Sequence, residues 1–218
     1  MDASQEVRGP APAPLSSPLP AWAWDHYVIR EKGFTLGRQY RVFDNAGNLL
    51  AFCRQKMFKL KEDIRFYDDE AQGRELFRLQ ATQVLDWSGN FDVVEADTGR
   101  RLGSLRRRGW KSLVRDEWHV VDEHDRPWGR AIEDSWTLSL LRRATDLLPD
   151  IFGAGGGLIP NTYHLERATL GAPLRVGYVK ERFQIFGDTY DLALFEDPQI
   201  DRRVLVGLAV CLDAIEGE

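Results

Sequence analysis

The sequence predicts a mainly β protein, a closed antiparallel barrel of about twelve strands around one apolar C-terminal helix. Two observations lead to this prediction. Short alternating segments separated by acidic, glycine-containing turns recur from residue 40 onward, and the helix expected over residues 201–215 contains a stretch, residues 204–212, that is wholly apolar or glycine. A helix that is apolar on every side has no solvent face, so protein or lipid must enclose it.

The strands are predicted from a local pattern that recurs at intervals of about 26 residues. Each unit begins with an aromatic residue and continues through alternating residues to an acidic turn and a second strand. The four units begin at Tyr40, Phe66, Phe91 and Trp118. Alternation with period two is typical of half-buried strands, and Asp, Asn and Gly adopt the backbone conformations of hairpin turns. The repetition therefore predicts a meander of hairpins.

Further strands are expected on both sides of these repeats. One covers His26–Glu31, and four more cover residues 163–168, 174–180, 182–186 and 190–195. A long antiparallel meander leaves open edges unless it closes into a barrel. The interior of a barrel of this size must be filled, and the apolar C-terminal helix is suited to fill it.

A bilayer is a poor environment for this helix because its apolar part is too short. Residues 204–212 would rise about 13 Å along a helix axis, against a hydrocarbon core of about 30 Å. Asp201, Arg202 and Arg203 before this stretch and Asp213 after it prevent a longer apolar span. We therefore expect the helix to be enclosed by the sheet.

Three segments lie outside the strand pattern. Residues 1–21 are rich in proline and lack the apolar region of a signal peptide, so we expect a disordered tail, either inert or recognised by a proline-binding partner. Residues 22–218 are assigned to the barrel domain. Within it, residues 135–148 form a predicted helix with a leucine stripe, which either packs across the barrel mouth or lies at a membrane interface. Residues 153–157 form a glycine-rich loop without the Gly-Lys-Ser/Thr ending of a phosphate-binding loop.

Composition narrows the functional classes. The chain of 218 residues has a net charge of −5, which does not imply nucleic-acid binding. Its two cysteines, Cys53 and Cys211, provide neither a disulfide framework nor metal-ligand spacing, so the reducing cytoplasm is the expected location. The four histidines lie on different predicted elements, and no nucleophile motif is present. We therefore expect a protein that is not an enzyme.

The layout of the chain resembles the tubby C-terminal-like superfamily, and within it the branch of LURP-one-related and phospholipid scramblase proteins. The matching stretches are residues 40–48, 118–122 and 195–215, in which an acidic turn and a basic pair precede the apolar helix. The resemblance implies a twelve-stranded barrel around a C-terminal helix. It also implies that the function lies among phosphoinositide head-group binding, calcium-dependent lipid scrambling and roles without assigned biochemistry.

A basic segment is the main candidate for a binding site. It runs from Arg100 and Arg101 to Arg115 without an acidic residue. Its densest part, with a tryptophan embedded, consists of Arg106, Arg107, Arg108, Trp110 and Lys111. Anionic lipid attracts such cations, and tryptophan favours the membrane interface. The segment is interpreted as a head-group site, although a solvated hairpin rim or a nucleic-acid contact has the same composition. Lys56, Lys59 and Lys61 around Phe58 allow the same interpretations.

An acidic group precedes the last helix. The resemblance implies calcium binding near Glu196, Asp197 and Asp201, and oxygen ligands suit that cation. Their spacing does not follow an EF-hand, and Asp197 before Pro198 has the pattern of a helix N-cap. We therefore expect no metal or other cofactor, with calcium implied only by the resemblance.

These expectations favour a non-catalytic barrel that binds anionic phospholipid head groups at a basic rim, in the cytoplasm or attached peripherally to a membrane. Two alternatives remain open. One is a scramblase-like membrane protein whose last helix enters the bilayer. The other is a soluble scaffold that recruits protein partners through its proline-rich tail and barrel surface.

Overall fold

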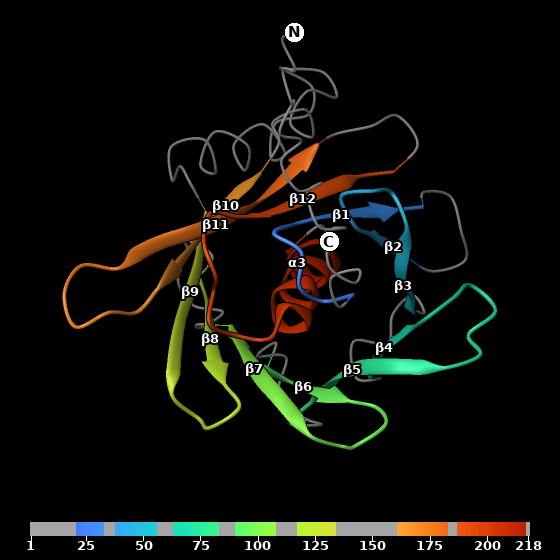
Figure 1. The fold of residues 1–218 in the computed structure, drawn as a ribbon, viewed down its shortest axis with the longest axis horizontal. Helices are drawn as coiled ribbons and strands as arrows, with labels where there is room; N and C mark the ends of the chain where they lie inside the picture. Colours follow the sequence, from blue (N-terminus) through green and yellow to red (C-terminus); the bar gives the residue numbers. More distant parts are fainter. Residues whose placement is uncertain are drawn as a thin grey trace, which may run out of the picture.

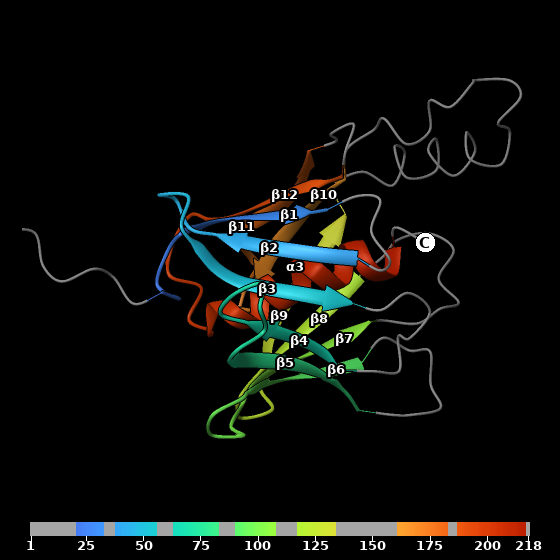
Figure 2. The ribbon, with the colours of Figure 1, turned by 90° about the vertical axis from the view of Figure 1, so that its right-hand side faces the viewer.

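The computed structural model of the protein describes residues 21–32, 38–55, 63–82, 90–107, 117–133, 161–182 and 187–216. They form a closed antiparallel barrel of twelve strands with the helix α3 (Arg202–Glu216) running through its middle (Figures 1 and 2). The first six strands are β1 (His26–Glu31), β2 (Arg38–Phe43), β3 (Leu49–Gln55), β4 (Ile64–Tyr67), β5 (Glu75–Ala81) and β6 (Asn90–Glu95). The other six are β7 (Arg101–Arg107), β8 (Glu117–Asp122), β9 (Pro127–Glu133), β10 (Thr162–Arg167), β11 (Leu174–Arg182) and β12 (Thr189–Leu194).

The barrel closes because the first and last strands pair with each other. Every strand pairs with its neighbours in sequence, and β1 pairs with β12 in the register Ile29↔Tyr190. Closure leaves no strand edge exposed along the barrel wall. The predicted fold class, a closed antiparallel barrel around a C-terminal helix, is confirmed.

The aromatic residues that begin the four sequence repeats form part of the interior. Tyr40, Phe66 and Trp118 have no exposed surface, and Phe91 is 3% exposed. They belong to β2, β4, β8 and β6, whose inward residues alternate with outward polar ones. Because each of these strands is followed by a hairpin partner, the recurring sequence unit corresponds to one hairpin of the barrel wall.

Helix α3 fills the barrel with apolar side chains. Val204, Leu208 and Cys211 have no exposed surface, and every residue from 204 to 212 except Gly207 belongs to the buried hydrophobic core. At Gly207 a side chain would meet the wall, since a Cβ atom placed there would lie 2.7 Å from a methyl carbon of Leu79. The helix therefore lies against the strands at this point. No helix among the described residues is both long enough and apolar enough to span a bilayer.

One predicted strand is wrong at its start, and several predictions fall outside the described residues. Arg182, expected to begin a separate strand, is the last residue of β11 and pairs directly with Thr189 of β12. Residues 183–186 are not described. The predicted helix 135–148, the glycine-rich loop 153–157 and residues 1–20 of the tail also lie outside the described residues.

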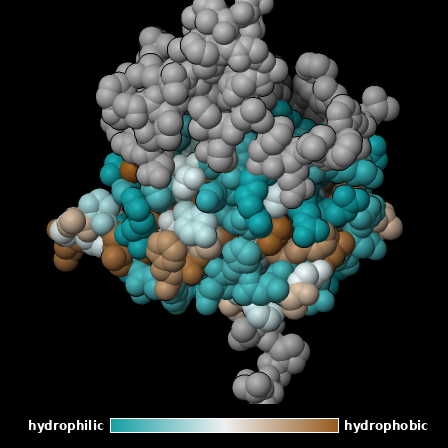
Figure 3. Space-filling view, turned by 90° about the horizontal axis from the view of Figure 1, so that it is seen from above, coloured by the Kyte–Doolittle hydropathy of each residue, from teal (hydrophilic) through white to brown (hydrophobic). Residues whose placement is uncertain are grey.

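The outer surface is mainly polar, with one apolar prominence. The exposed large hydrophobic side chains among the described residues are Leu170, Leu174 and Phe195. Leu170 and Leu174 lie at the β10–β11 hairpin, which projects beyond the barrel wall (Figure 1), and Phe195 follows β12. On the face seen in Figure 3, hydrophilic groups surround scattered hydrophobic ones, some of them on the projecting part.

The two ends of the barrel differ in how the strands are connected. At one end, here called the turn end, short described segments join consecutive elements, and α3 begins. These segments are residues 44–48, 68–74, 96–100, 123–126, 168–173 and 195–201. The other end, where α3 finishes, is here called the Asp213 end (Figure 2). Most residues that connect strands at the Asp213 end lie outside the described ranges.

Candidate functional site

Acidic side chains organise the hairpins at the turn end. In the β2–β3 turn, Asp44 Oδ1 accepts hydrogen bonds from the backbone N–H groups of Ala46 (2.9 Å) and Asn48 (2.8 Å). In the β8–β9 turn, Asp122 Oδ1 accepts in the same way from His124 (2.8 Å) and Arg126 (2.9 Å). Burial opposes ionisation, but these hydrogen bonds outweigh it and lower the pKa of both carboxyls. The acidic turn residues of the sequence repeat are therefore structural.

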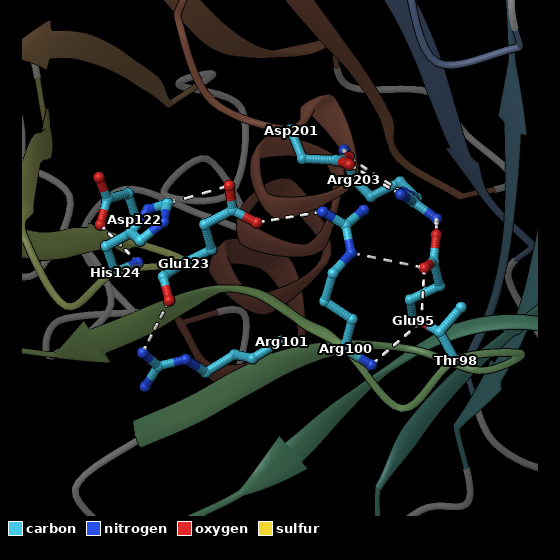
Figure 4. Close-up of polar contacts among 9 residues, drawn as sticks. All are labelled: Glu95, Thr98, Arg100, Arg101, Asp122, Glu123, His124, Asp201 and Arg203. Carbon is cyan, nitrogen blue, oxygen red and sulfur yellow. Dashed lines mark hydrogen bonds and ion pairs between the residues drawn. The ribbon is translucent and has the colours of Figure 1, made fainter.

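A network of ion pairs surrounds the start of α3 at the turn end (Figure 4). The guanidinium of Arg203 contacts Asp201 Oδ2 at 2.7 Å and Glu95 Oε1 at 2.9 Å, and its side chain is only 12% exposed. Burial disfavours the charge of Arg203, but the hydrogen bonds and charges of these two carboxylates outweigh burial and raise its pKa. Asp201 Oδ1 also accepts a hydrogen bond from the Arg203 backbone N–H at 3.0 Å, which makes Asp201 the N-cap of α3.

The first two cations of the predicted basic segment belong to this network. Arg100 contacts Glu95 Oε2 at 3.6 Å and Glu123 Oε2 at 3.1 Å (Figure 4). Arg101 contacts Asp125 Oδ2 at 2.7 Å, and this hydrogen bond raises the pKa of Arg101 and lowers that of Asp125. The charges of Arg100 and Arg101 are therefore largely matched by neighbouring carboxylates.

The three acidic residues considered for calcium each pair with an arginine. Glu196 contacts Arg167 at 3.4 Å, Asp197 contacts Arg202 at 3.4 Å, and Asp201 contacts Arg203. The predicted N-cap at Asp197 is wrong, because α3 begins at Arg202 and Asp201 caps it. Asp197 Oδ1 instead accepts a hydrogen bond from the backbone N–H of Gln199 at 3.1 Å, within the segment that leads into the helix.

A second polar group lies at the Asp213 end and is mostly buried. Asp213 of α3 is 6% exposed and accepts hydrogen bonds from the hydroxyls of Tyr40 (2.5 Å) and Tyr190. Arg38 Nη1 donates to Asp213 Oδ2 at 3.0 Å and to its backbone carbonyl at 2.7 Å. Burial, and then the charge of Asp213, raises the pKa of both tyrosines well above the ordinary value. Asp213 thus joins α3 to β2 and β12.

Three carboxylates converge at this end. One oxygen each from Glu31, Asp188 and Asp213 lies within 4.8 Å of the others, the only such group of possible metal ligands within the described part of the chain. Both oxygens of Asp213, however, already accept hydrogen bonds from tyrosine or arginine donors. The donors that satisfy Asp213 make this group a partly buried, hydrogen-bonded cluster, which we call the Asp213 cluster: Glu31, Arg38, Tyr40, Asp188, Tyr190 and Asp213.

Strand β7 divides the predicted basic segment between the two ends of the barrel. Arg100 and Arg101 lie at the turn end, whereas Arg106 and Arg107 lie at the Asp213 end. Arg107 is opposite the buried Trp118 in the pairing of β7 with β8, so the two side chains share the inner face, and Arg106 lies on the outer face. Arg108, Trp110 and Lys111 are outside the described residues.

The sequence interpretation missed the Asp213 cluster, although two signals of it were present. Glu31 and Arg38 have the same strand parity as the inward residues Ile29 and Tyr40, so each places a charge toward the interior. Asp213 directly follows the apolar stretch of the helix, so a charge lies at the end of a helix that is otherwise enclosed. Charged residues at core-facing positions are the signal that could have located this cluster.

The fold and its polar groups define a class of protein, a twelve-stranded antiparallel barrel closed around a helix whose two ends are held by charged side chains. The family model for LURP-one-related proteins matches residues 50–213, and the chain belongs to this family. The family resemblance inferred from the sequence is thereby confirmed. No curated protein matches the chain. An X-ray structure of a protein from Arabidopsis thaliana is similar, with a TM-score of 0.47 and 13% identity, over 89% of this chain and 94% of that one.

Proposed function

We propose that this LURP-one-related barrel is a non-catalytic protein that binds anionic phospholipid head groups at its Asp213 end, as a peripheral protein of the cytoplasmic membrane surface. The observation that carries the proposal is the contrast between arginines at the two ends of β7. Arg101 at the turn end lies 2.7 Å from a carboxylate oxygen. Arg106 at the Asp213 end is 40% exposed, and its ion pair with Asp92 is 3.8 Å long.

The hydrogen bonding of Asp92 supports this contrast. Its Oδ1 atom accepts a hydrogen bond from the Ser104 hydroxyl at 2.6 Å and is the same atom that Arg106 approaches. Arg106 is thus held near an acid without a short contact, and its guanidinium remains accessible to solvent. An exposed guanidinium can form charge-assisted hydrogen bonds to a phosphate group.

Two of the connections between strands are rich in cations in the sequence. Residues 56–63, between β3 and β4, contain Lys56, Lys59 and Lys61, and residues 108–116, between β7 and β8, contain Arg108 and Lys111. Both connections leave their strands at the Asp213 end. Cations near an anionic lipid surface contribute about 1 kcal/mol each. Several cations at one end would therefore attract the barrel to such a surface in one orientation.

Liposome flotation with two matched variants tests this proposal. One variant replaces Arg106, Arg107, Arg108 and Lys111 by Gln, and the control replaces Arg74, Arg100, Arg101 and Arg126 at the turn end by Gln. Both remove the same charge from the protein. We expect wild-type protein and the control to float at low salt with phosphatidylcholine vesicles that contain phosphatidylserine or phosphoinositide. The first variant should remain unbound, and no protein should float with phosphatidylcholine alone.

A third variant and a folding check make the flotation result decisive. Because Arg107 lies on the inner face, a variant that retains it and replaces only Arg106, Arg108 and Lys111 by Gln separates binding from stability. Melting temperature and far-UV circular dichroism establish that each variant is folded. Failure of wild-type protein to bind, or equal loss of binding in the turn-end control, would overturn the proposal.

Release of the protein from vesicles by salt or by detergent distinguishes the proposal from the scramblase-like alternative. In that alternative the last helix enters the bilayer, whereas in the structure α3 is enclosed by the strands. Electrostatic attachment is screened by salt, so we expect high salt to release the protein from anionic vesicles. Release only by detergent would favour insertion instead.

The protein-scaffold alternative has its own structural support in the apolar prominence. Leu170, Leu174 and Phe195 are exposed on or beside the β10–β11 hairpin at the turn end, away from the proposed lipid site. Exposed apolar groups that gather in one place often mark a contact surface. This alternative would become the better one if anionic vesicles fail to bind the wild-type protein.

A further inference from the structure

The Asp213 cluster gathers more negative than positive charge at the place where the barrel closes. Glu31 is the last residue of β1, Asp188 immediately precedes β12, and Asp213 lies near the end of α3. One oxygen of each carboxyl lies within 4.8 Å of the others. The strongest charges that act on Glu31 come from these two carboxylates and from Arg38, so two of the three are negative.

Arg38 is placed closer to Asp213 than to Glu31. Its Nη1 atom lies 3.0 Å from Asp213 Oδ2, while its Nε atom lies 3.8 Å from Glu31 Oε1. Both tyrosine hydroxyls also donate to Asp213. The short hydrogen bonds of the cluster are therefore directed at Asp213 and not at Glu31. The Glu31 side chain is 16% exposed, and its contact with Arg38 is long. The charges of two carboxylates, Asp213 and Asp188, also act on it.

We propose that Glu31 binds a proton near neutral pH, and that loss of this proton weakens the attachment of the C-terminal end of α3 to β1, β2 and β12. The proton removes the repulsion between Glu31 and the two carboxylates whose oxygens lie within 4.8 Å of its own. Its release at higher pH restores that repulsion where the helix and the closing strands meet. The barrel would thereby carry a pH-sensitive contact at its Asp213 end, independently of any lipid binding.

The electrostatics of Glu31 agree with this geometry. Burial, and then the charge of Asp213, raises its pKa from 4.5 to about 7, against the opposing effect of Arg38. Asp188 contributes in both directions, since its charge raises the pKa and its backbone hydrogen bond lowers it. From β2, Tyr40 also faces the cluster, and from β12 Tyr190 does so, both as neutral hydroxyls with raised pKa values. Lys32, the next residue after Glu31, is exposed.

The sign of the effect follows from proton binding. The folded protein binds the Glu31 proton more tightly than the unfolded chain, so stability is highest where both states are protonated. Between about pH 4.5 and about pH 7, Glu31 has lost its proton in the unfolded chain but keeps it in the folded protein. Stability therefore declines as the pH rises through this range. Above that range the loss is complete and stability no longer changes through Glu31.

The Glu31→Gln variant tests the proposal because its amide resembles a protonated carboxyl at every pH. Urea unfolding should give nearly equal stability for wild type and variant at pH 4.5. At pH 8 the unfolding equilibrium constant of the wild type should be larger by about tenfold or more. The control Glu123→Gln, at the turn end, should change stability by a similar amount at both pH values. Hydrogen exchange of the last turn of α3 should show the same pH-dependent difference.

Three results would overturn the proposal. The first is a stability difference between wild type and Glu31→Gln that does not vary with pH. The second is a carboxyl carbon signal of Glu31 that titrates near pH 4.5 in the nuclear magnetic resonance spectrum of the wild-type protein. This measurement needs no variant, so it remains informative if the substituted chain fails to fold. The third concerns a metal ion. Calcium chloride that raises the melting temperature of the wild type but not of Glu31→Gln at pH 8 would show a metal ion as the occupant, which also contradicts the proposal.

Discussion

The two ends of the barrel hold the same helix by different means. At the turn end, Arg203 at the start of α3 pairs with Asp201 and Glu95, and further arginines pair with carboxylates from the neighbouring hairpins. At the Asp213 end, one carboxylate near the end of α3 accepts hydrogen bonds from two tyrosines and one arginine. At the turn end the ion pairs are distributed among several residues, whereas at the Asp213 end the hydrogen bonds converge on Asp213.

This difference implies unequal sensitivity to substitution. Ion pairs between exposed groups each contribute little, because water and salt screen them. Removal of one partner from a buried group leaves the others without a partner in a medium of low polarity, and this is strongly destabilising. We therefore expect changes at the Asp213 end to affect stability more than comparable changes at the turn end.

The largest effect is expected from Leu208→Asp, because it disrupts the apolar packing of α3, the helix that both ends hold. Leu208 has no exposed surface in the middle of α3. An unpaired carboxylate there would cost several kcal/mol, so we expect loss of soluble folded protein, measured by gel filtration and circular dichroism. Leu208→Met, which is also apolar and similar in volume, is the control and should fold. A folded Asp variant with an unchanged melting temperature would show that the barrel does not enclose the helix.

At the Asp213 end, Asp213→Ala should be the most damaging polar substitution. It would leave the hydroxyls of Tyr40 and Tyr190 and the guanidinium of Arg38 without their common acceptor. We expect a loss of about 3 kcal/mol in the free energy of unfolding, measured by urea denaturation. The triple substitution that also changes both tyrosines to Phe should recover part of this loss, because it removes two unpaired hydroxyls. If Asp213→Ala lowered the free energy of unfolding only as much as the removal of an exposed charge does, the two ends of the barrel would not differ in sensitivity.

The corresponding change at the turn end, Asp201→Ala, should have a smaller effect. It removes the N-cap of α3 and one of the two carboxylates that pair with Arg203, while Glu95 remains. A lost cap costs about 1 kcal/mol, and urea denaturation can resolve this amount. Asp201→Asn should retain most of the stability, since its side chain can still accept the Arg203 N–H. If Asp201→Ala were as damaging as Asp213→Ala, the turn end would also depend on one residue.

The smallest effect is expected from Arg100→Gln. The Arg100 side chain is 54% exposed and pairs with two carboxylates of the network. Exposed pairs contribute about 0.2–1 kcal/mol, so the melting temperature should change little and the difference should shrink further in high salt. A large decrease in melting temperature that persists in high salt would mean that Arg100 and its carboxylate partners behave as buried ion pairs.

The fold was predictable because its main determinants are local. Aromatic residues at the start of each repeat and alternating residues after them indicated which side chains face inward, and the apolar stretch of α3 indicated what they surround. The sequence also predicts the start of α3 close to its observed position, although Asp197 before Pro198 has the more typical N-cap pattern. The sequence pattern alone does not decide between two nearby acidic residues, because the choice depends on which one lies beside the first free N–H groups.

The Asp213 cluster was not predictable in the same way because its members meet only when the barrel closes. Glu31 and Arg38 come from the first two strands, whereas Asp188 immediately precedes β12, Tyr190 lies in β12 and Asp213 lies in α3. Their proximity depends on the register of β1 against β12, which the alternating pattern of either strand does not specify. The basic segment raises a similar difficulty. Its sequence does not show that β7 places Arg101 at the turn end of the barrel and Arg106 at the Asp213 end.

The position of α3 after all twelve strands affects how the protein is made. During synthesis every strand leaves the ribosome before the residues that will occupy the interior, and β1 cannot pair with β12 until almost the whole barrel has been translated. Sheets that depend on such distant pairings fold slowly, and their unpaired strands are prone to aggregation. We therefore expect the nascent barrel to remain open until the helix is complete, and its yield in cells to depend on chaperones that bind exposed strands.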